Sequence, residues 1–382
     1  MRRRLFQAEH EAYRESVRAF VAKEVTPSYP SWETAGIVPR DLFAKAGELG
    51  MFAAVPAAYG GEGVSDFRFN VIVSEEAARA GVSPAMAGPL LQADVVLPYL
   101  LKLTDHEQRQ RWLPDVATGR TITAVAMTEP GAGSDLAGIR TAARRDGDCY
   151  VVNGAKTFIT NGVNADLVVT AVRTGDHPHR GLSLLVLERG MPGFTRGRNL
   201  DKVGQHAQDT AELSFVDVRV PATHLLGAEG DGFAGLTSQL VQERLSVAVS
   251  AVAQARAAFS WTVDHVRDRR AFGAPVGALQ NTRFRLAEID TELDLAQQYV
   301  DRCVEELLAG TLSAVDAAKA KWWTTEMQGR VIDTCVQLHG GYGYVLEHPI
   351  ARAYVDARVT RIYGGATEVM KDIVGRSLGL TG

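Results

Sequence analysis

The hydrophobic periodicity of the chain changes twice along its length, and these changes constrain the fold more than any other feature. Up to about residue 118, apolar side chains recur at helical spacing, most clearly in residues 8–25, 67–80 and 107–113. Short β-branched runs follow between Gly, Asp, Asn and Pro clusters, namely TITAVAM, CYVVNGAKTFIT, DLVVTAVR, GLSLLVLE and AELSFVDVRV. Helical patterns return in residues 231–266, 279–308 and 312–339. We therefore predict an α+β protein with an N-terminal helical domain (residues 1–119), a middle antiparallel β domain (120–230) and a C-terminal four-helix bundle (231–382).

Composition excludes several classes of protein. The net charge of -4 over 382 residues gives no basic field for nucleic acid. The three cysteines, Cys149, Cys303 and Cys335, are far apart, so neither a disulfide framework nor a metal site is predicted, and a cytoplasmic location is expected. The start, MRRRLFQAEHEAYRE, lacks the features of a signal peptide, and no apolar run is long enough to cross a membrane. We expect a soluble protein.

One carboxylate lies within an apolar helical pattern. Glu243, in LTSQLVQERLSVAV, shares a helix face with Leu236, Leu240 and Val247 and should therefore project inward. It could fix helix packing through an ion pair, which is the more common role of such a residue. It could also be a general base, because an apolar surrounding raises the pKa of a carboxyl group toward neutral pH.

Glycine-rich motifs follow two of the predicted strands and recur in the bundle. MTEPGAGSD (residues 127–135) and FITNG (158–162) could be simple turns, and neither is a P-loop or a dinucleotide fingerprint. RRAFG (269–273), Gln280, QLHGGYGY (337–344) and IYGGATE (362–368) are each equivocal alone. His339 by itself is more typical of a structural histidine than of a metal ligand.

Taken together and in order, these motifs resemble the acyl-CoA dehydrogenase family over essentially the full chain. The resemblance implies the same three-domain fold, FAD as cofactor, and a homotetramer in which a neighbouring subunit completes the cofactor site. Thr128 would face the flavin ring, Ser134 would lie where flavin and substrate meet, and Phe158 with Thr160 would pack on the flavin. The implied cofactor-binding residues are Met127, Thr128, Gly133, Ser134, Phe158, Ile159, Thr160, Arg269, Gln280, Gln337, Leu338, His339, Gly340, Gly341, Ala366, Thr367 and Glu368. The implied substrate-binding residues are Ser134, Arg244, Gly364 and Gly365.

One departure from the family pattern indicates the branch. Many members carry the catalytic glutamate immediately after the tyrosine of an IYEGT motif, whereas here Gly364 follows Tyr363. The long-chain and isovaleryl branch places the base on the first long bundle helix before an arginine, which corresponds to Glu243 and Arg244. Ala366 also stands where the family usually has threonine. The lost hydrogen bond is worth only about 0.5 to 1.5 kcal/mol and should not abolish flavin binding.

The resemblance also implies a mechanism. Glu243 would remove the proton α to the thioester carbonyl while a hydride passes from the β carbon to flavin N5, giving a trans-2-enoyl-CoA. The backbone amide of Gly364 and a flavin ribityl hydroxyl would hold the carbonyl oxygen, and an electron-transfer flavoprotein would accept the electrons. The nearest function is that of a long-chain acyl-CoA dehydrogenase in fatty-acid β-oxidation.

Two alternatives remain at this stage. One is a dehydrogenase or oxidase that acts on an acyl or aminoacyl group bound to a carrier protein. The other is a noncatalytic helical scaffold with a decayed flavin site, which Gly364 and Ala366 would suit.

Overall fold

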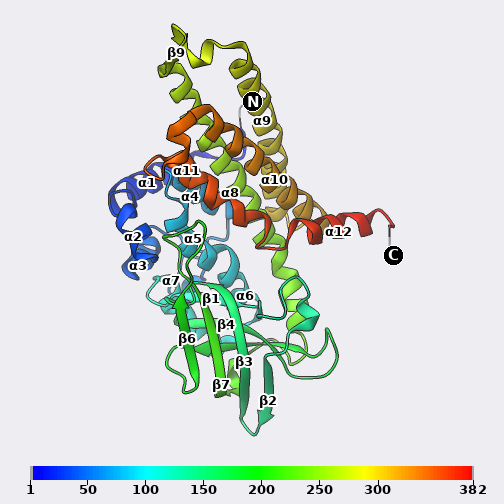
Figure 1. Cartoon of the computed structure of the whole chain (residues 1–382). Coiled ribbons are helices and arrows are strands. Elements are labelled where there is room, and N and C mark those ends of the chain that lie inside the picture. The colour runs from blue at the N-terminus through cyan, green and yellow to red at the C-terminus, as the bar shows by residue number, and fades with distance from the viewer. Residues whose placement is uncertain (1–2, 381–382) are drawn as a thin grey trace.

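The N-terminal part of the chain is helical, as the periodicity predicts. The computed structural model describes residues 3–380 and is shown in Figure 1. The predicted helix over residues 8–25 is α1 continued by a π-helical segment, and the other two predicted helices are α4 and α7. The helices are α1 (Ala8–Phe20), α2 (Tyr29–Ala35), α3 (Asp41–Glu48), α4 (Phe67–Arg79), α5 (Ser83–Leu91), α6 (Leu97–Leu103) and α7 (His106–Ala117).

The middle part forms one sheet in the order β6-β7-β3-β2-β4-β5-β8, with β1 paired to β4. Its strands are β1 (Thr123–Ala126), β2 (Ala142–Asp146), β3 (Cys149–Thr160), β4 (Leu167–Arg173), β5 (Leu182–Glu188), β6 (Phe194–Asn199), β7 (Thr210–Pro221) and β8 (Leu225–Leu226). All five predicted strands are present. The periodicity missed three strands of this sheet, β2, β6 and β8. The polar sequences of β2 and β6, AARRD and FTRGRN, are largely exposed, and β8 has only two residues.

The prediction of a purely antiparallel sheet is wrong at β1. This strand runs parallel to β4, from Thr123 opposite Leu167 to Ala126 opposite Thr170, and β2 also touches β4 in parallel. The chain between β1 and β4 includes the β2–β3 hairpin, so it is long enough for the crossover that parallel strands require. Residue alternation reports which face of a strand is buried but carries no information on strand direction.

The C-terminal part is built on three long helices with short elements between and after them. These are α8 (Gly232–Asp268), the hairpin β9 (Arg270–Ala271) and β10 (Ala274–Pro275), α9 (Gln280–Leu308), α10 (Ala314–His339), α11 (Pro349–Ala357) and α12 (Thr367–Ser377). The Ser313 side chain accepts a hydrogen bond from the Asp316 backbone N–H and caps α10. The β9 hairpin lies at the end of the molecule opposite the sheet, and α12 projects sideways (Figure 1).

Helix α8 connects the bundle to the N-terminal helices. It packs against α10, α9 and α4, and one apolar core runs through all four helices. Leu245, Ala248 and Val252 of α8 meet Val71 of α4 and Met327 of α10 in this core. Helix α8 is therefore held in place by elements from two different parts of the chain.

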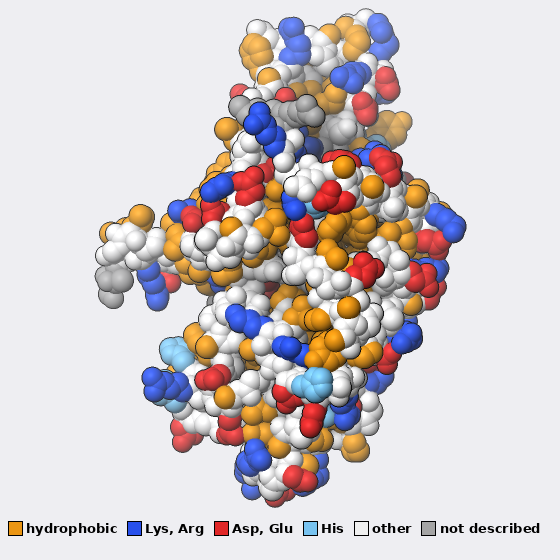
Figure 2. Space-filling model, turned by 180° about the vertical axis from the view of Figure 1, so that it is seen from behind, with side chains coloured by type: hydrophobic (Ala, Val, Ile, Leu, Met, Phe, Trp, Pro, Cys, Tyr) orange, Lys and Arg blue, Asp and Glu red, His pale blue; other side chains and the backbone are white. Residues whose placement is uncertain are grey.

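The molecular surface carries charges of both signs. Lys and Arg side chains are interspersed with Asp and Glu side chains over the face shown in Figure 2. No helix among residues 3–380 is long and apolar enough to cross a membrane. Within the same residues, no group of His, Cys, Asp and Glu side chains is arranged to hold a metal ion.

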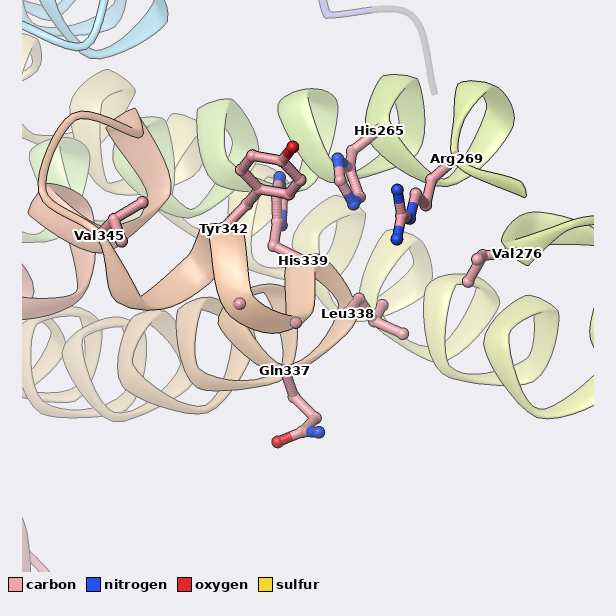
Figure 3. A pocket seen from close by; sticks show the side chains of 10 residues that line it. His265, Arg269, Val276, Gln337, Leu338, His339, Tyr342 and Val345 are labelled. Atoms are coloured by element: carbon pink, nitrogen blue, oxygen red, sulfur yellow. The ribbon is translucent and has the colours of Figure 1, made fainter. Parts of the chain in front are cut away.

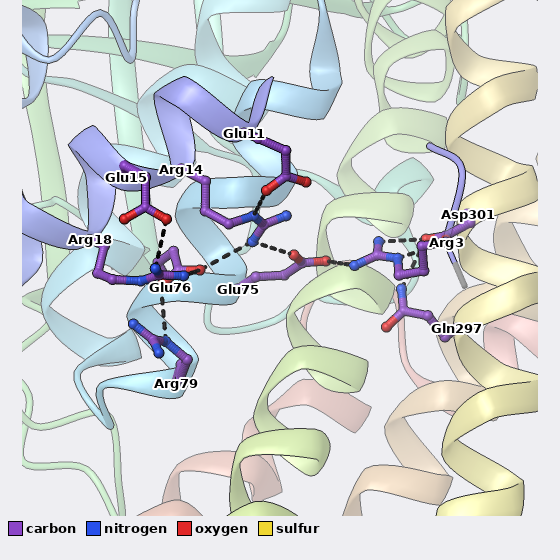
Figure 4. A network of polar contacts seen from close by, with 10 residues as sticks. All are labelled: Arg3, Glu11, Arg14, Glu15, Arg18, Glu75, Glu76, Arg79, Gln297 and Asp301. Carbon is purple, nitrogen blue, oxygen red and sulfur yellow. Dashed lines mark hydrogen bonds and ion pairs between the residues drawn. The ribbon is translucent and has the colours of Figure 1, made fainter. Parts of the chain in front are cut away.

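A polar network joins the N-terminal segment to α4 and α9 (Figure 4). Arg3 donates to Asp301 of α9 at 2.6 Å and to Glu75 of α4 at 2.6 Å, and Arg14 of α1 donates to Glu75 at 2.9 Å. Glu76 beside them accepts from Arg14 at 3.2 Å and from Arg18 at 3.1 Å. Burial raises the pKa of Glu76, but the hydrogen bonds from Arg18 and Arg14 together with the charges of Arg79 and Arg18 hold the pKa below its usual range.

Glu76→Gln should therefore destabilise the protein by about 1–3 kcal/mol at neutral pH, because it removes a buried charge that arginines surround. A carboxyl with a lowered folded-state pKa stabilises above its unfolded pKa and loses this effect as pH falls through the folded value. The difference in urea midpoint between wild type and variant should thus shrink below pH 5. Glu15→Gln, which alters an exposed partner of Arg18, is the control and should change stability by less than about 0.5 kcal/mol. A difference that does not depend on pH would contradict this account.

Candidate active site

Glu243 is half-buried on α8, with Oε2 of its carboxylate enclosed in the packed protein. Less than 1 Å² of its Oε2 is exposed, and this atom has no hydrogen-bond partner within the described chain. Burial raises the pKa of Glu243 to about 7, while the nearby charges of Arg244 and Lys321 act to lower it. The inward projection predicted from the helical spacing is thus confirmed. An ion pair that merely fixes packing is disfavoured, because the structure describes no such pair for this carboxylate.

The glycine pair before α12 lies directly against this carboxylate. Gly364 and Gly365 have φ values of 63° and 104°, a backbone conformation that other residues adopt at a cost. A Cβ placed on Gly364 would lie 3.7 Å from Oε1 of Glu243 and 3.3 Å from Cγ2 of Val247. A side chain at residue 364 and the side chain of Glu243 therefore converge on the same region of the site.

Arg244 is buried next to Glu243, and its Nε has no hydrogen-bond partner among the described residues. Its Nε would lie 3.9 Å from a Cβ on Gly365, so the guanidinium borders the same glycine turn. Burial lowers the pKa of Arg244, and Glu243 opposes this shift. The sequence did not indicate Lys321, which is fully buried on α10 and donates to the Gly365 carbonyl at 2.6 Å.

The MTEPGAGSD loop after β1 is held by a buried ion pair that the sequence analysis also missed. Lys156 of β3 donates to Glu129 Oε1 at 2.8 Å and to the Met127 carbonyl at 2.9 Å, while the Thr157 N–H donates to the Thr128 carbonyl at 2.9 Å. Burial raises the pKa of Glu129, but the hydrogen bonds from Lys156, Thr141 and Arg140 together with the charge of Lys156 bring it below its usual range. The loop is therefore rigidly attached at Met127 to Glu129.

The tip of this loop is open. A Cβ on Gly131 or Gly133 would meet no atom within 4 Å, and Ser134 is exposed. The predicted contact residues Met127, Thr128, Gly133 and Ser134 thus come from one rigid loop with an accessible tip.

Phe158 interrupts β3 in a conformation that is unusual for a side chain of its size. Its φ is 59° and its side chain is 67% exposed, at a register shift between Lys156 and Ile159. Thr160 accepts a hydrogen bond from Gln208 Nε2 at 2.8 Å. Ile159, in contrast, packs in the sheet core, so its side chain is not available to a ligand.

A second group of predicted residues gathers far from the sheet. Arg269, Gln337, Leu338, His339, Gly340 and Gly341 line a cavity of about 510 Å³ together with His265, Val276, Tyr342 and Val345 (Figure 3). His339 is a structural histidine in that its Nδ1 hydrogen-bonds the Cys335 carbonyl at 2.8 Å, but its buried Nε2 has no partner among residues 3–380. His265 stacks on His339 with ring centroids 4.3 Å apart and was not foreseen from the sequence.

Four other predicted residues do not line this cavity, and one of them, Ala366, is the half-buried N-cap residue of α12. Gln280 and Glu368 are exposed at the first turns of α9 and α12, and Thr367 is buried and hydrogen-bonded to Glu326 at 3.1 Å. Figure 1 shows the β9 hairpin and the sheet at opposite ends of the molecule. Within one chain, the predicted cofactor contacts therefore form separate groups.

The chain is similar to known proteins over almost its whole length. The family models for the N-terminal, middle and C-terminal domains of acyl-CoA dehydrogenase match residues 7–120, 124–218 and 230–379. The mitochondrial long-chain specific acyl-CoA dehydrogenase of Sus scrofa is 43% identical over 380 residues, which cover 98% of this chain and 88% of that protein.

Two solved structures extend the comparison. An acyl-CoA dehydrogenase from Geobacillus kaustophilus is 51% identical with a TM-score of 0.96, covering 99% of this chain and 100% of the other. A glutaryl-CoA dehydrogenase from Mycobacterium smegmatis in complex with FADH2 is 27% identical with a TM-score of 0.92, covering 99% and 97%. The chain therefore belongs to the acyl-CoA dehydrogenase family, a family of FAD-dependent oxidoreductases.

Proposed function

We propose that this protein oxidises a fatty acyl-CoA thioester to the trans-2-enoyl-CoA, with Glu243 as the catalytic base. The observation that carries the proposal is a carboxylate whose buried Oε2 has no hydrogen-bond partner among the described residues, set against the positive-φ turn at Gly364. The relation to a long-chain specific relative at 43% identity supports a long-chain acyl group and a place in fatty-acid β-oxidation. The cytoplasmic location expected from the cysteines stays a prediction.

The residues around Glu243 suit proton abstraction next to a carbonyl. A general base is most effective when its pKa lies near the working pH, and the pKa of Glu243 is raised to about 7. The Gly364 N–H takes part in no hydrogen bond of the described chain and can donate to a thioester oxygen. A glycine at this position keeps that donor and leaves space for the base on α8.

The residues present fit FAD at both predicted groups. The cavity beside Arg269 offers a cation, the unpartnered Nε2 of His339 and open space above Gly340 and Gly341, which suits a diphosphate and adenosine. The rigid loop carrying Thr128 and the exposed Phe158 suit the flavin ring. When bound, FAD supplies the hydride acceptor for the β carbon.

The separation of the two groups supports a cofactor site shared between subunits of a homotetramer. The C-terminal domain also exposes large apolar side chains, among them Phe272, Phe284, Leu295 and Tyr344, and such surfaces typically pack against another subunit. We expect an electron-transfer flavoprotein to reoxidise the reduced cofactor, as the family resemblance implies. The scaffold alternative is disfavoured. A carboxylate whose buried Oε2 has no hydrogen-bond partner opposes folding, and a noncatalytic scaffold would not require such a group.

Glu243→Gln should reduce the rate of flavin reduction by an acyl-CoA at least about 100-fold, because the amide keeps the shape of the side chain but cannot accept the proton. The measurement is anaerobic single-turnover bleaching of the flavin with a saturating long-chain acyl-CoA. Glu305→Gln, the same change on an exposed face of α9, is the control and should bleach at the wild-type rate. Bleaching of Glu243→Gln at the wild-type rate would show that Glu243 is a packing residue.

The pH dependence should report the same carboxylate. Because the pKa of Glu243 is raised from 4.5 to about 7, the base is mostly protonated at pH 6 and ionised at pH 8. The ratio kcat/KM should therefore rise about tenfold per pH unit below pH 7 and reach a plateau above pH 7. A profile that is flat from pH 5 to 8 would place the base outside this buried environment.

Arg269→Ala should weaken FAD binding about 10- to 100-fold, because a charge-assisted hydrogen bond to phosphate is lost. In the shared-site arrangement it should also loosen the tetramer, as followed by light scattering alongside flavin absorbance. Arg267→Ala removes an exposed arginine of the same helix and should change neither property. A wild-type monomer that retains one FAD per chain would rule out the shared site.

A further inference from the structure

Lys321 is a buried lysine whose ammonium makes no close ion pair. Its side chain is 0% exposed on α10, and within residues 3–380 its one hydrogen bond goes to the Gly365 carbonyl at 2.6 Å. Lysines are rarely buried to this degree unless a carboxylate pairs with them. Lys156, the other fully buried lysine, follows this rule and contacts Glu129 at 2.8 Å. The position of Lys321 therefore calls for a different explanation.

The Gly365 carbonyl belongs to the turn that borders Glu243. Gly364 and Gly365 both have positive φ values, and glycine pairs can adopt many backbone conformations. A Cβ on Gly364 would lie 3.7 Å from the Glu243 carboxylate, so small rotations of this turn change what faces the carboxylate. A charged donor that holds the next carbonyl restricts those rotations.

Lys321 also belongs to the set of charges around Glu243. Arg244 and Lys321 act to lower the pKa of Glu243. Burial and the charge of Glu243 raise the pKa values of Tyr99 and Tyr363, so both hydroxyl groups are neutral at physiological pH. Around Lys321 itself the charged groups are Arg244, Glu243, Glu326 and Glu368. Burial lowers the pKa of Lys321 to about 8, so the ammonium is still charged at neutral pH.

We propose that Lys321 is a positioning residue of the Glu243 site, one that anchors the Gly364–Gly365 turn through the Gly365 carbonyl and supplies a buried positive charge that favours ionised Glu243. The lysine contacts the turn and not the reacting atoms. This inference rests on the proposed function, in which Glu243 is the base and the Gly364 amide a donor. The two effects of the ammonium, hydrogen bonding and charge, can be separated by substitution.

Two variants divide the effects in the FAD-loaded protein. Lys321→Gln removes the charge but keeps an N–H donor, whereas Lys321→Met removes both. The ionisation of Glu243 is followed directly by difference infrared spectroscopy of its protonated carboxyl band against pH, with Glu243→Gln to assign the band. Both variants should raise the pKa of Glu243 by about 0.5 to 1 unit, because a nearby positive charge is lost. Only Lys321→Met should also lower the flavin-reduction rate on the high-pH plateau, by about tenfold. Only this variant lacks a hydrogen-bond donor to hold the Gly364–Gly365 turn.

Thr324→Val is the matched control. Thr324 is fully buried one turn further along α10. Its hydroxyl donates only to backbone carbonyls of its own helix, to Ala320 at 2.7 Å and to Lys321 at 3.4 Å, and it does not contact the Lys321 ammonium. This variant disturbs the helix to a similar degree but should leave the Glu243 titration unchanged. If both Lys321 variants titrate Glu243 at the wild-type pH, or if Thr324→Val shifts it equally, the proposal is overturned.

The reciprocal measurement needs no change at Lys321. Because the coupling is mutual, the Lys321 ammonium in Glu243→Gln, followed by NMR of ¹⁵N-labelled lysine, should titrate at lower pH than in wild type. Equal titration in the two proteins would refute the electrostatic role even if the Lys321 variants fail to fold. The proposed function fails by a different result. If the flavin of Glu243→Gln is reduced at the wild-type rate, Glu243 is not the base, even if the Lys321 ammonium titrates at lower pH in that variant.

Discussion

The burial of the Glu243 carboxylate is the constraint on which the arrangement of the site depends. A carboxylate removed from water without a hydrogen-bond partner opposes folding unless nearby charges compensate it. Here Arg244 lies beside it on α8, Lys321 approaches from α10, and the Gly364–Gly365 turn closes the space between the helices. Because neither cation pairs with it closely, the carboxylate keeps a pKa near neutrality, as a base for carbon acids requires.

The two fully buried lysines illustrate two uses of the same side chain. Lys156 contacts Glu129 at 2.8 Å and fixes the loop that offers Thr128, so its charge is largely neutralised where it lies. Lys321 instead binds a neutral carbonyl and leaves its charge to act on Glu243 from a distance. A paired buried charge makes a rigid support, while an unpaired one changes the ionisation of its neighbours.

Much of the fold could be predicted because helical and strand periods are local properties. The order of helices and strands, the span of α8 and the inward face of Glu243 all follow from spacing along the chain. Strands β2 and β6 could not be predicted in this way, since they are mostly exposed and owe their structure to pairing with β3 and β7. The parallel run of β1 beside β4 was equally hidden, because strand direction is set by the path of the intervening chain.

The sequence by itself determined the class of the protein and the residue types available for its chemistry. Both follow from local features, namely the order of the motifs and the apolar helical spacing around one glutamate. Only the tertiary structure decided which of those residues meet. It placed residue 364 against Glu243 although the two are far apart in the chain, and it brought Lys321 to the same turn. It also separated the predicted cofactor contacts on the sheet from those that line the cavity beside Arg269. The physical reason is that burial, and with it the pKa of a carboxylate, depends on neighbours that packing supplies, and no local pattern records them.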